Sequence, residues 1–300
     1  MDMHHLLQWI VVGVTVLVTG ASVPAAEEGR HLELQKVLLS SGVELNYMER
    51  GKGIPVIFVH GTLGDYSVWD GQLGAFAKTY RVLAYSRRYN YPNSNKPRPN
   101  HSALVEAEDL FGFIKQLNLG KVHLIGHSYG GYTALCLALK HPELVLTLTL
   151  VEPPVVFAEG KIEEDKLSAM RRARAAFEKG DSEGAIRAVV DSSDPGKYDK
   201  IPESFRQLLL RNGGELRALV TSDDMYPPLD RAAIRKIAVP TLLLSGERSP
   251  VSLKSVSLEL ERLLPENGRR QIIIRNADHG MWFQRPDACR KAVLEFLKGK

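Results

Sequence analysis

The chain contains two kinds of hydrophobic pattern: short apolar runs, which are typical of strands, and apolar residues spaced three to four apart, which are typical of helices. Short apolar runs predict strands at residues 54–59, 81–85, 121–125, 144–151, 239–246 and 271–275, preceded by an antiparallel pair at 31–40 and 43–51. Apolar residues spaced three to four apart predict helices at 65–78, 102–117, 132–140 and 287–298. Strands that alternate with helices indicate an α/β fold with a mostly parallel, doubly wound sheet.

This alternation stops between Pro153 and Ile237. The intervening sequence is charged and contains no convincing strand, but its periodicity predicts helices at 162–179, 182–190, 203–212 and 215–220. We therefore expect a helical insertion at about 153–237 within one domain. A chain of 300 residues, of which 44% are hydrophobic, is long enough for one large domain with a well-buried core.

The N-terminal segment differs in composition from the rest of the chain. An apolar stretch at 6–18 is followed by small residues up to Ala26 and then by two glutamates. This order is typical of a secretory signal peptide, residues 1–25, with cleavage after Ala25. It predicts an exported protein, periplasmic or secreted, whose domain spans 26–300 and does not contact the membrane after cleavage. Because no lysine or arginine precedes Arg30, an uncleaved membrane anchor is the alternative.

The segment Gly126-His127-Ser128-Tyr129-Gly130 lies between a predicted strand and a predicted helix. A Gly-x-Ser-x-Gly at such a junction forces the serine into a strained turn, so that its hydroxyl stands above the sheet. The flanking glycines allow the strand and helix backbones to approach closely. We interpret Ser128 as a catalytic nucleophile, and a glycine turn that merely contains a serine is the alternative.

Two further motifs follow predicted strands: His60-Gly61 after 56–59, and Asp278-His279-Gly280 near the C-terminus. Together with the Gly-x-Ser-x-Gly, in this order and spacing, they make residues 31–298 resemble the α/β-hydrolase superfamily. The resemblance implies the α/β-hydrolase fold, with the 153–237 insertion as a helical cap over the active site. It also implies that His279 is the catalytic base.

The acid of the predicted triad departs from the commoner family pattern. After the strand at 241–245 the family usually has Gly-x-x-Asp, but here Ser249 occupies the aspartate position. Some members take the acid from the end of the strand that follows the nucleophile helix, where this chain has Glu152. A glutamate that closes a buried strand needs a partner, and we therefore expect Glu152 to be the acid. Glu247, or no acid at all, is the alternative.

Two backbone donors are expected to form an oxyanion hole. The N–H of Tyr129 lies at a helix N-terminus, where the helix dipole favours negative charge, and the resemblance implies the N–H of Thr62 as the second donor. His60 is expected to orient this loop by hydrogen bonding. The candidate pocket residues, which would accept a small or medium apolar group, are His60, Trp69, Phe157, Tyr226, Met281 and Trp282.

Charge and motif content exclude several other functions. The formal net charge of +4 is spread along the chain without an aromatic-interleaved basic stripe, so we do not expect nucleic acid as a partner. The run Arg87-Arg88, with Lys96 and Arg98, is interpreted as a solvated loop. The sequence has no His-Glu-x-x-His, no closely spaced cysteine pair and no nucleotide-binding glycine loop, so we expect neither a metal nor another cofactor.

The two cysteines, Cys136 and Cys289, do not form a dense disulfide framework. One lies on the predicted helix after the nucleophile and the other on the last predicted helix. In the resembled fold these helices cover opposite faces of the sheet. We therefore expect two free, buried thiols.

These observations lead to a serine hydrolase, and specifically to a carboxylesterase that cleaves small to medium apolar esters through an acyl-enzyme on Ser128. Its partner would be a small-molecule ester, and the chain would be a monomer or a homodimer. Carbon–carbon bond hydrolases, lactonases and perhydrolases share the same triad and are alternatives. Dehalogenases and epoxide hydrolases require an aspartate nucleophile, so Ser128 argues against both. A non-catalytic, ligand-binding member of the fold is the alternative from another class, and Ser249 motivates it.

Overall fold

The protein is described by a computed structural model that covers residues 33–158, 164–192 and 195–300. The predicted signal peptide, 1–25, lies outside these residues. Within the described ranges, no helix has the length and apolar character needed to cross a membrane.

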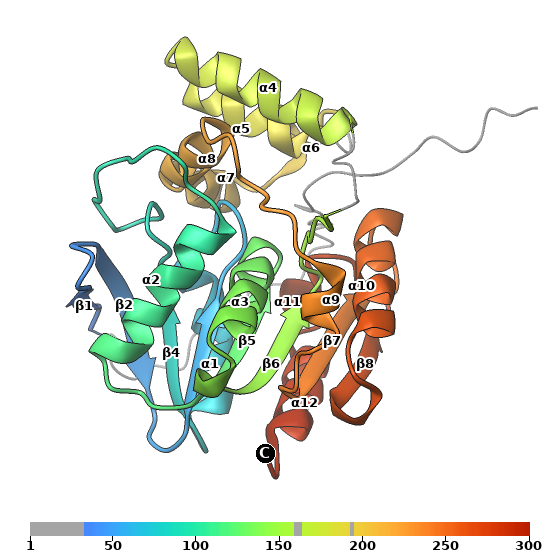
Figure 1. The fold of residues 1–300 in the computed structure, drawn as a ribbon. Coiled ribbons are helices and arrows are strands. Elements are labelled where there is room, and N and C mark those ends of the chain that lie inside the picture. Colours follow the sequence, from blue (N-terminus) through green and yellow to red (C-terminus); the bar gives the residue numbers. More distant parts are fainter. Residues whose placement is uncertain (1–32, 159–163, 193–194) are drawn as a thin grey trace, which may run out of the picture.

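An eight-stranded sheet forms the centre of the molecule, with the strand order β1-β2-β4-β3-β5-β6-β7-β8 (Figure 1). Strand β2 pairs antiparallel with β1 and β4, and all other neighbours are parallel, which confirms the predicted fold class. The strands are β1 (Gln35–Leu38), β2 (Glu44–Arg50), β3 (Pro55–Val59), β4 (Arg81–Tyr85), β5 (Val122–His127), β6 (Val145–Val151), β7 (Thr241–Gly246) and β8 (Arg269–Ile274).

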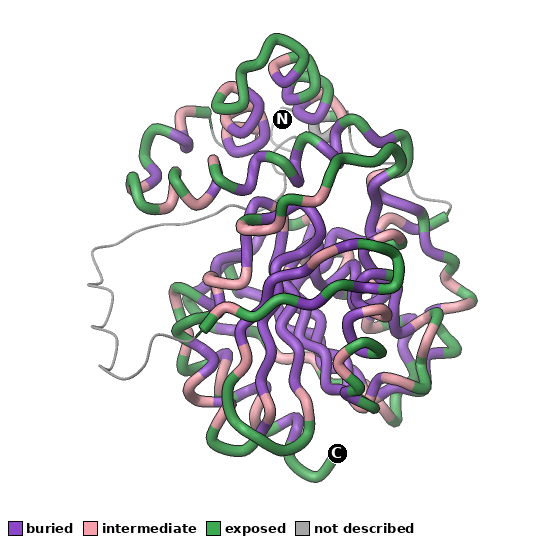
Figure 2. The backbone as a smooth tube through the Cα atoms, turned by 90° about the vertical axis from the view of Figure 1, so that its left-hand side faces the viewer, coloured by how far each residue is buried: buried purple, intermediate pink, exposed green. Residues whose placement is uncertain are grey.

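Helices cover both faces of this sheet, and each face has its own apolar cluster. Alternate residues of one strand point to opposite faces, so Ile57 and Val59 of β3 join the first cluster while Val56 and Phe58 join the second. The first cluster packs under α2 (Ala103–Gln116), α3 (Tyr129–Lys140), α9 (Arg231–Ile234) and α10 (Val251–Leu263). The second packs under α1 (Asp70–Phe76), α11 (Met281–Gln284) and α12 (Pro286–Leu297). Figure 2 shows the strands as a buried layer at the centre, while the exposed stretches lie on the surrounding helices and loops.

The two cysteines lie in different clusters. Cys136 on α3 belongs to the first and Cys289 on α12 to the second, and both are free and buried. The expectation of two unpaired thiols is therefore confirmed. Because the sheet separates them, they cannot meet to form a bridge without unfolding.

Between β6 and β7 the chain leaves the sheet and builds a layer of helices that lies across one end of it (Figure 1). This layer has its own apolar core, which includes Phe177, Ile186, Tyr198 and Leu216 and also takes in Leu63 from the loop after β3. We call these helices the cap. They are α4 (Glu164–Glu178), α5 (Ser182–Val190), α6 (Lys197–Lys200), α7 (Glu203–Arg211) and α8 (Gly213–Val220).

The cap is attached to the loops that follow the carboxyl ends of β3 and β4. Arg211 of α7 pairs with Asp65, with 2.8 Å between Nε and Oδ2. The side chain of Asn212 donates to the same Asp65 oxygen at 2.8 Å and accepts from the N–H of Tyr91, also at 2.8 Å. In a parallel sheet the carboxyl ends of the strands lie at one edge, where functional loops gather. The cap therefore covers the edge at which the predicted motifs end.

Candidate active site

Ser128 occupies a strained turn between β5 and α3. Its φ of 52° and ψ of −125° lie outside the regions that non-glycine residues favour, and its own N–H is held by the carbonyl of Val151 at 2.9 Å. A Cβ on Gly126 would lie only 2.5 Å from the carbonyl oxygen of Gly130, and one on Gly130 would overlap the carbonyl oxygen of Val59. The two glycines are therefore required for the turn, as expected of a nucleophile elbow.

Glu152 and His279, 127 positions apart in sequence, meet next to His127, the residue that precedes Ser128. Nδ1 of His279 donates to Oε2 of Glu152 at 2.7 Å, and both side chains are almost completely buried. The other carboxylate oxygen accepts the N–H of Gly246 at 2.9 Å. With Nδ1 donating to the carboxylate, Nε2 of His279 is left as the proton acceptor. This is the arrangement that a base and its orienting acid require.

Among the described residues, His279 forms no hydrogen bond with the side chains of Ser249, Glu247 or Asp278. Ser249 is buried, and its hydroxyl has no hydrogen-bond partner among the described residues. The exposed Glu247 accepts the N–H of Asn276 at 2.8 Å. Asp278, next to the predicted base, accepts the N–H of Gly280 at 2.8 Å and so shapes its own loop. Of the carboxylates considered, the structure brings Glu152 to His279.

His127 supports the same histidine from the other side. Its Nε2 lies 3.0 Å from the carbonyl oxygen of His279, and the two imidazole rings are 4.6 Å apart. Burial, and then the neighbouring His279, lower the pKa of His127 to about 3. His127 is thus a neutral donor that fixes the backbone of the predicted base, a role that sequence reasoning did not identify.

The loop after β3 lies against the nucleophile. A Cβ on Gly61 would be 3.0 Å from Cβ of Ser128, so only glycine lets the two backbones approach in this way. His60 is buried beneath the loop: its Nδ1 donates to the carbonyl of Gly61 at 2.9 Å and its Nε2 accepts the N–H of Arg87 at 3.0 Å. Burial, and then the Arg87 charge, lower the pKa of His60 to about 3, so the ring is neutral at pH 7.

The two expected oxyanion donors are available. Within the described part of the chain, no hydrogen bond uses the N–H of Thr62 or that of Tyr129. The second of these lies at the N-terminus of α3, where the helix dipole favours an anion. Both N–H groups flank Ser128, Tyr129 as the next residue and Thr62 on the loop that touches it.

The expectation that Arg87-Arg88 forms a solvated loop is wrong. Both side chains are buried: Arg88 forms a two-pronged pair with Asp109, with both distances 2.6 Å, and Arg87 pairs with Glu106 of α2 and with Glu215 of α8. These carboxylates lie far along the sequence, so a local charge run could not reveal them. The signal that could have revealed Arg87 is its position in the sequence, because Arg87 follows the carboxyl end of β4, where site loops gather.

Three of the candidate pocket residues lie together in the core on one face of the sheet, and two others lie outside that cluster. Trp69, Met281 and Trp282 pack in the core on the α1 and α12 side of the sheet, where the two indole rings are 5.4 Å apart. Phe157 lies under the guanidinium of Arg231, 4.5 Å from its centre. Tyr226, from the end of the cap insertion, contacts the ring of Tyr129 at 5.7 Å and so lies next to the elbow.

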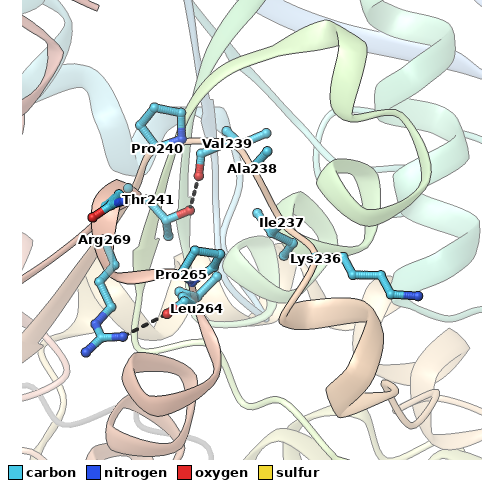
Figure 3. Close-up of a pocket in the computed structure, with 11 residues that line it drawn as sticks. Lys236, Ile237, Ala238, Val239, Pro240, Thr241, Leu264, Pro265 and Arg269 are labelled. Atoms are coloured by element: carbon cyan, nitrogen blue, oxygen red, sulfur yellow. Dashed lines mark hydrogen bonds between the residues drawn. The ribbon is translucent and has the colours of Figure 1, made fainter.

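A separate cavity of about 330 Å³ lies at the amino ends of β7 and β8, at the opposite edge of the sheet (Figure 3). Two of its polar side chains are already paired: Thr241 donates to the carbonyl of Val239 at 2.9 Å, and Arg269 to that of Leu264 at 2.8 Å. None of the predicted catalytic residues lines it. Among the described residues, no group of three His, Cys, Asp or Glu side chains forms a metal site.

Comparisons with known proteins agree with this fold. The profile of the alpha/beta hydrolase fold family matches residues 54–286. The chain is 27% identical to 2-hydroxy-6-oxo-6-(2'-aminophenyl)hexa-2,4-dienoic acid hydrolase of Metapseudomonas resinovorans, covering 91% of this chain and 93% of that one. It is 28% identical to the sn-1-specific diacylglycerol lipase ABHD11 of Mus musculus, over 81% and 80% of the two chains.

Among solved structures, an esterase from Thermogutta terrifontis superimposes with a TM-score of 0.72 at 23% identity, over 89% of this chain and 98% of that one. At this identity the likeness concerns the fold alone. The family profile covers well over half of the chain. This chain therefore belongs to the alpha/beta hydrolase fold family.

Proposed function

We propose that this protein is a serine hydrolase that works through an acyl-enzyme on Ser128. The observation that carries the proposal is the 2.7 Å hydrogen bond between His279 and Glu152 beside a serine in a strained turn. In this mechanism Nε2 of His279 removes the hydroxyl proton as the serine oxygen attacks the substrate carbonyl. The buried carboxylate of Glu152 stabilises the imidazolium that results.

The tetrahedral intermediate carries its negative charge on the former carbonyl oxygen, which the N–H groups of Thr62 and Tyr129 would bind. When the intermediate collapses, His279 returns the proton to the leaving oxygen and the acyl group remains on Ser128. Water then attacks the acyl carbonyl, with His279 again as base, and the acid product leaves. Every proton in this cycle is exchanged through one histidine.

For the bond cleaved, we propose a carboxylic ester with small to medium apolar groups. The relative from Mus musculus, named as a diacylglycerol lipase, supports ester chemistry. Ser128 in place of an aspartate argues against dehalogenase and epoxide hydrolase chemistry. A carbon–carbon bond hydrolase is the second candidate, because the relative from Metapseudomonas resinovorans, whose name describes a dienoic acid hydrolase, matches over nearly the whole chain.

The experiment that tests the proposal is labelling with a fluorophosphonate, followed by mass spectrometry of the peptides. We expect one adduct on Ser128 that is lost in Ser128→Ala and in His279→Ala but kept in Ser249→Ala. Absence of an adduct on folded wild-type protein would refute the serine hydrolase and favour the non-catalytic member of the fold. A panel of 4-nitrophenyl esters, lactones and ring-fission dienones then decides the bond: turnover of the dienones alone would replace the esterase by the carbon–carbon bond hydrolase.

A further inference from the structure

Glu215 of the cap reaches the loop that carries a proposed oxyanion donor. Its side chain is completely buried, and its two oxygens have different partners. Oε2 accepts the N–H of Leu63 at 2.7 Å, while Oε1 accepts from Nη2 of Arg87 at 2.6 Å. The same Nη2 also donates to the carbonyl of Gly61 at 3.2 Å. One carboxylate and one guanidinium therefore hold both ends of the segment Gly61 to Leu63.

These contacts fix the direction of the N–H of Thr62. The carbonyl of Gly61 and the N–H of Thr62 belong to one planar, trans peptide unit and point in opposite directions. The carbonyl of Gly61 is bound by Arg87, by His60 and by the N–H of Gly64 at 3.2 Å, and this aims the N–H of Thr62 away from them. The next peptide unit is fixed by the bond from Leu63 to Glu215. Two consecutive peptide planes are therefore fixed, the second by Glu215, and the first of them carries the donor.

The backbone of this loop is strained at the residue that Glu215 binds. Leu63 has a φ of 59°, a left-handed conformation that is unfavourable for a bulky side chain. The N–H that Glu215 binds belongs to this strained residue. Loss of the carboxylate would allow Leu63 to relax, and the peptide that carries the Thr62 N–H would rotate with it.

We propose that Glu215 is a positioning residue for the oxyanion hole, through which the cap holds the N–H of Thr62 in its productive direction. The inference rests on the proposed function, since it concerns the stabilisation of an oxyanion on Ser128. The cap would then contribute to catalysis in addition to covering the active site. The cap is also attached to the core through Arg211 and Asp65. Attachment of the cap therefore does not by itself account for the complete burial of Glu215.

Substitution by glutamine isolates this role. A carboxylate accepts on both oxygens, whereas an amide accepts on one and donates from the other. Glu215→Gln can therefore satisfy Leu63 or Arg87 but not both, with almost no change in volume. Glu215→Asp keeps the charge beside Arg87 but is one methylene shorter, so it too cannot span both partners. Arg211→Gln is the matched control, because it weakens an ion pair between cap and core without touching the loop at Gly61 to Leu63.

The measurement is kcat and KM for the 4-nitrophenyl ester that the wild type hydrolyses best, together with inhibition by a trifluoromethyl ketone. This inhibitor forms a charged tetrahedral adduct with an active-site serine, whereas the matching methyl ketone reports ground-state binding. For Glu215→Gln we expect kcat to fall by about 10²-fold with KM nearly unchanged, the cost of a donor misplaced by about 1 Å. Affinity for the trifluoromethyl ketone should fall by a similar factor, and affinity for the methyl ketone should not change.

The outcomes separate this inference from the proposed function. An inactive and unlabelled wild type would overturn the function itself. An active wild type with unchanged kcat in Glu215→Gln would overturn only the role of Glu215. The role would also be overturned if Arg211→Gln lost as much kcat, or if both Glu215 variants lost their native thermal melting transition, because Glu215 would then be a general support of the cap.

Discussion

Two buried carboxylate clusters support the candidate site, and they differ in the partner that each carboxylate has. Glu152 faces a histidine, His279, whose ring can take up and release a proton. Glu106 and Glu215 share the guanidinium of Arg87, which stays protonated at all pH values of interest, and Oε1 of Glu106 also lies 2.9 Å from Nε2 of His101. Both clusters are completely buried, so burial alone does not distinguish a catalytic group from a supporting one.

The partner of a buried carboxylate decides what that carboxylate does. Beside a base that changes charge during the reaction, a fixed negative charge stabilises the charged state of that base. Beside a permanent cation, the same charge makes burial of that cation possible and holds the groups around it in place. We therefore expect loss of the Glu152 charge to appear in kcat alone, whereas loss of Arg87, the cation that the second cluster shares, should appear first in stability.

The largest effect is expected for Glu152→Gln. The amide can still bind Gly246 through its oxygen, but its NH₂ would then donate to Nδ1 of His279 and hold the ring in the tautomer that cannot accept the serine proton. We expect kcat to fall by about 10⁴-fold while the thermal melting transition is retained. Steady-state hydrolysis of the preferred ester measures this.

Ser249→Ala is the matched control for that variant, because Ser249 occupies the position where the family usually has its acid. Its hydroxyl lacks a partner among the described residues, and its removal should leave kcat unchanged. If Ser249→Ala reduced kcat strongly and Glu152→Gln did not, the assignment of the acid would be wrong.

Arg87→Met should produce the next largest effect, and in stability. It leaves Glu106 and Glu215 buried without their cation, and breaking a buried ion pair from one side costs about 3–5 kcal/mol. Urea unfolding of the two proteins measures the difference. Lys36→Met, which removes an exposed pair with Glu44, serves as the control and should change little. An Arg87→Met protein as stable as that control would mean that the cluster does not support the fold.

The fold was predictable because the strands carry a strong local signal. The segment Arg81–Tyr85 was predicted with the bounds that the structure has, and the cap helix Ser182–Val190 likewise. A helix predicted to start at residue 65 instead begins with a 3₁₀ turn at Tyr66–Trp69, because the side chain of Asp65 accepts the N–H of Ser67 and tightens the first turn. Local hydrogen bonding decided this boundary, and hydrophobic periodicity does not report it.

The candidate site was predictable in part. Ser128 and His279 stand in short motifs that a single sequence shows, and the burial argument led to Glu152. Arg87, Glu106 and Glu215 were missed because their relation is tertiary: α2, α8 and the loop after β4 bring them together, and each alone is an ordinary charged residue.

Acidification should separate the two clusters further. Burial alone would raise the pKa of Glu106, but the Arg87 charge together with the contact to His101 outweighs burial and holds the pKa at about 2, against 4.5 in the unfolded chain. The folded-state pKa is depressed, so the stability that Glu106 contributes is present above pH 4.5 and is lost as pH falls toward 2. We expect the difference in unfolding free energy between wild type and Glu106→Gln to shrink over this window, by at most about 1.4 kcal/mol per pH unit. Urea unfolding at several pH values below 6 measures it, and a constant difference would contradict the pairing with Arg87.

The smallest effect concerns the two cysteines, whose thiols are buried in the apolar clusters on the two faces of the sheet. Burial raises the pKa of both Cys136 and Cys289 to about 12, so neither forms thiolate near neutral pH. We expect no reaction of the native protein with iodoacetamide at pH 8 and reaction of both thiols once it is unfolded in urea, counted by intact mass. Fast alkylation of native protein would show that its cores open readily. Protection of both thiols in the native protein would complete the comparison: Glu152 faces the proposed base, Glu106 and Glu215 share the permanent cation of Arg87, and the thiols in the two apolar clusters stay neutral and inert.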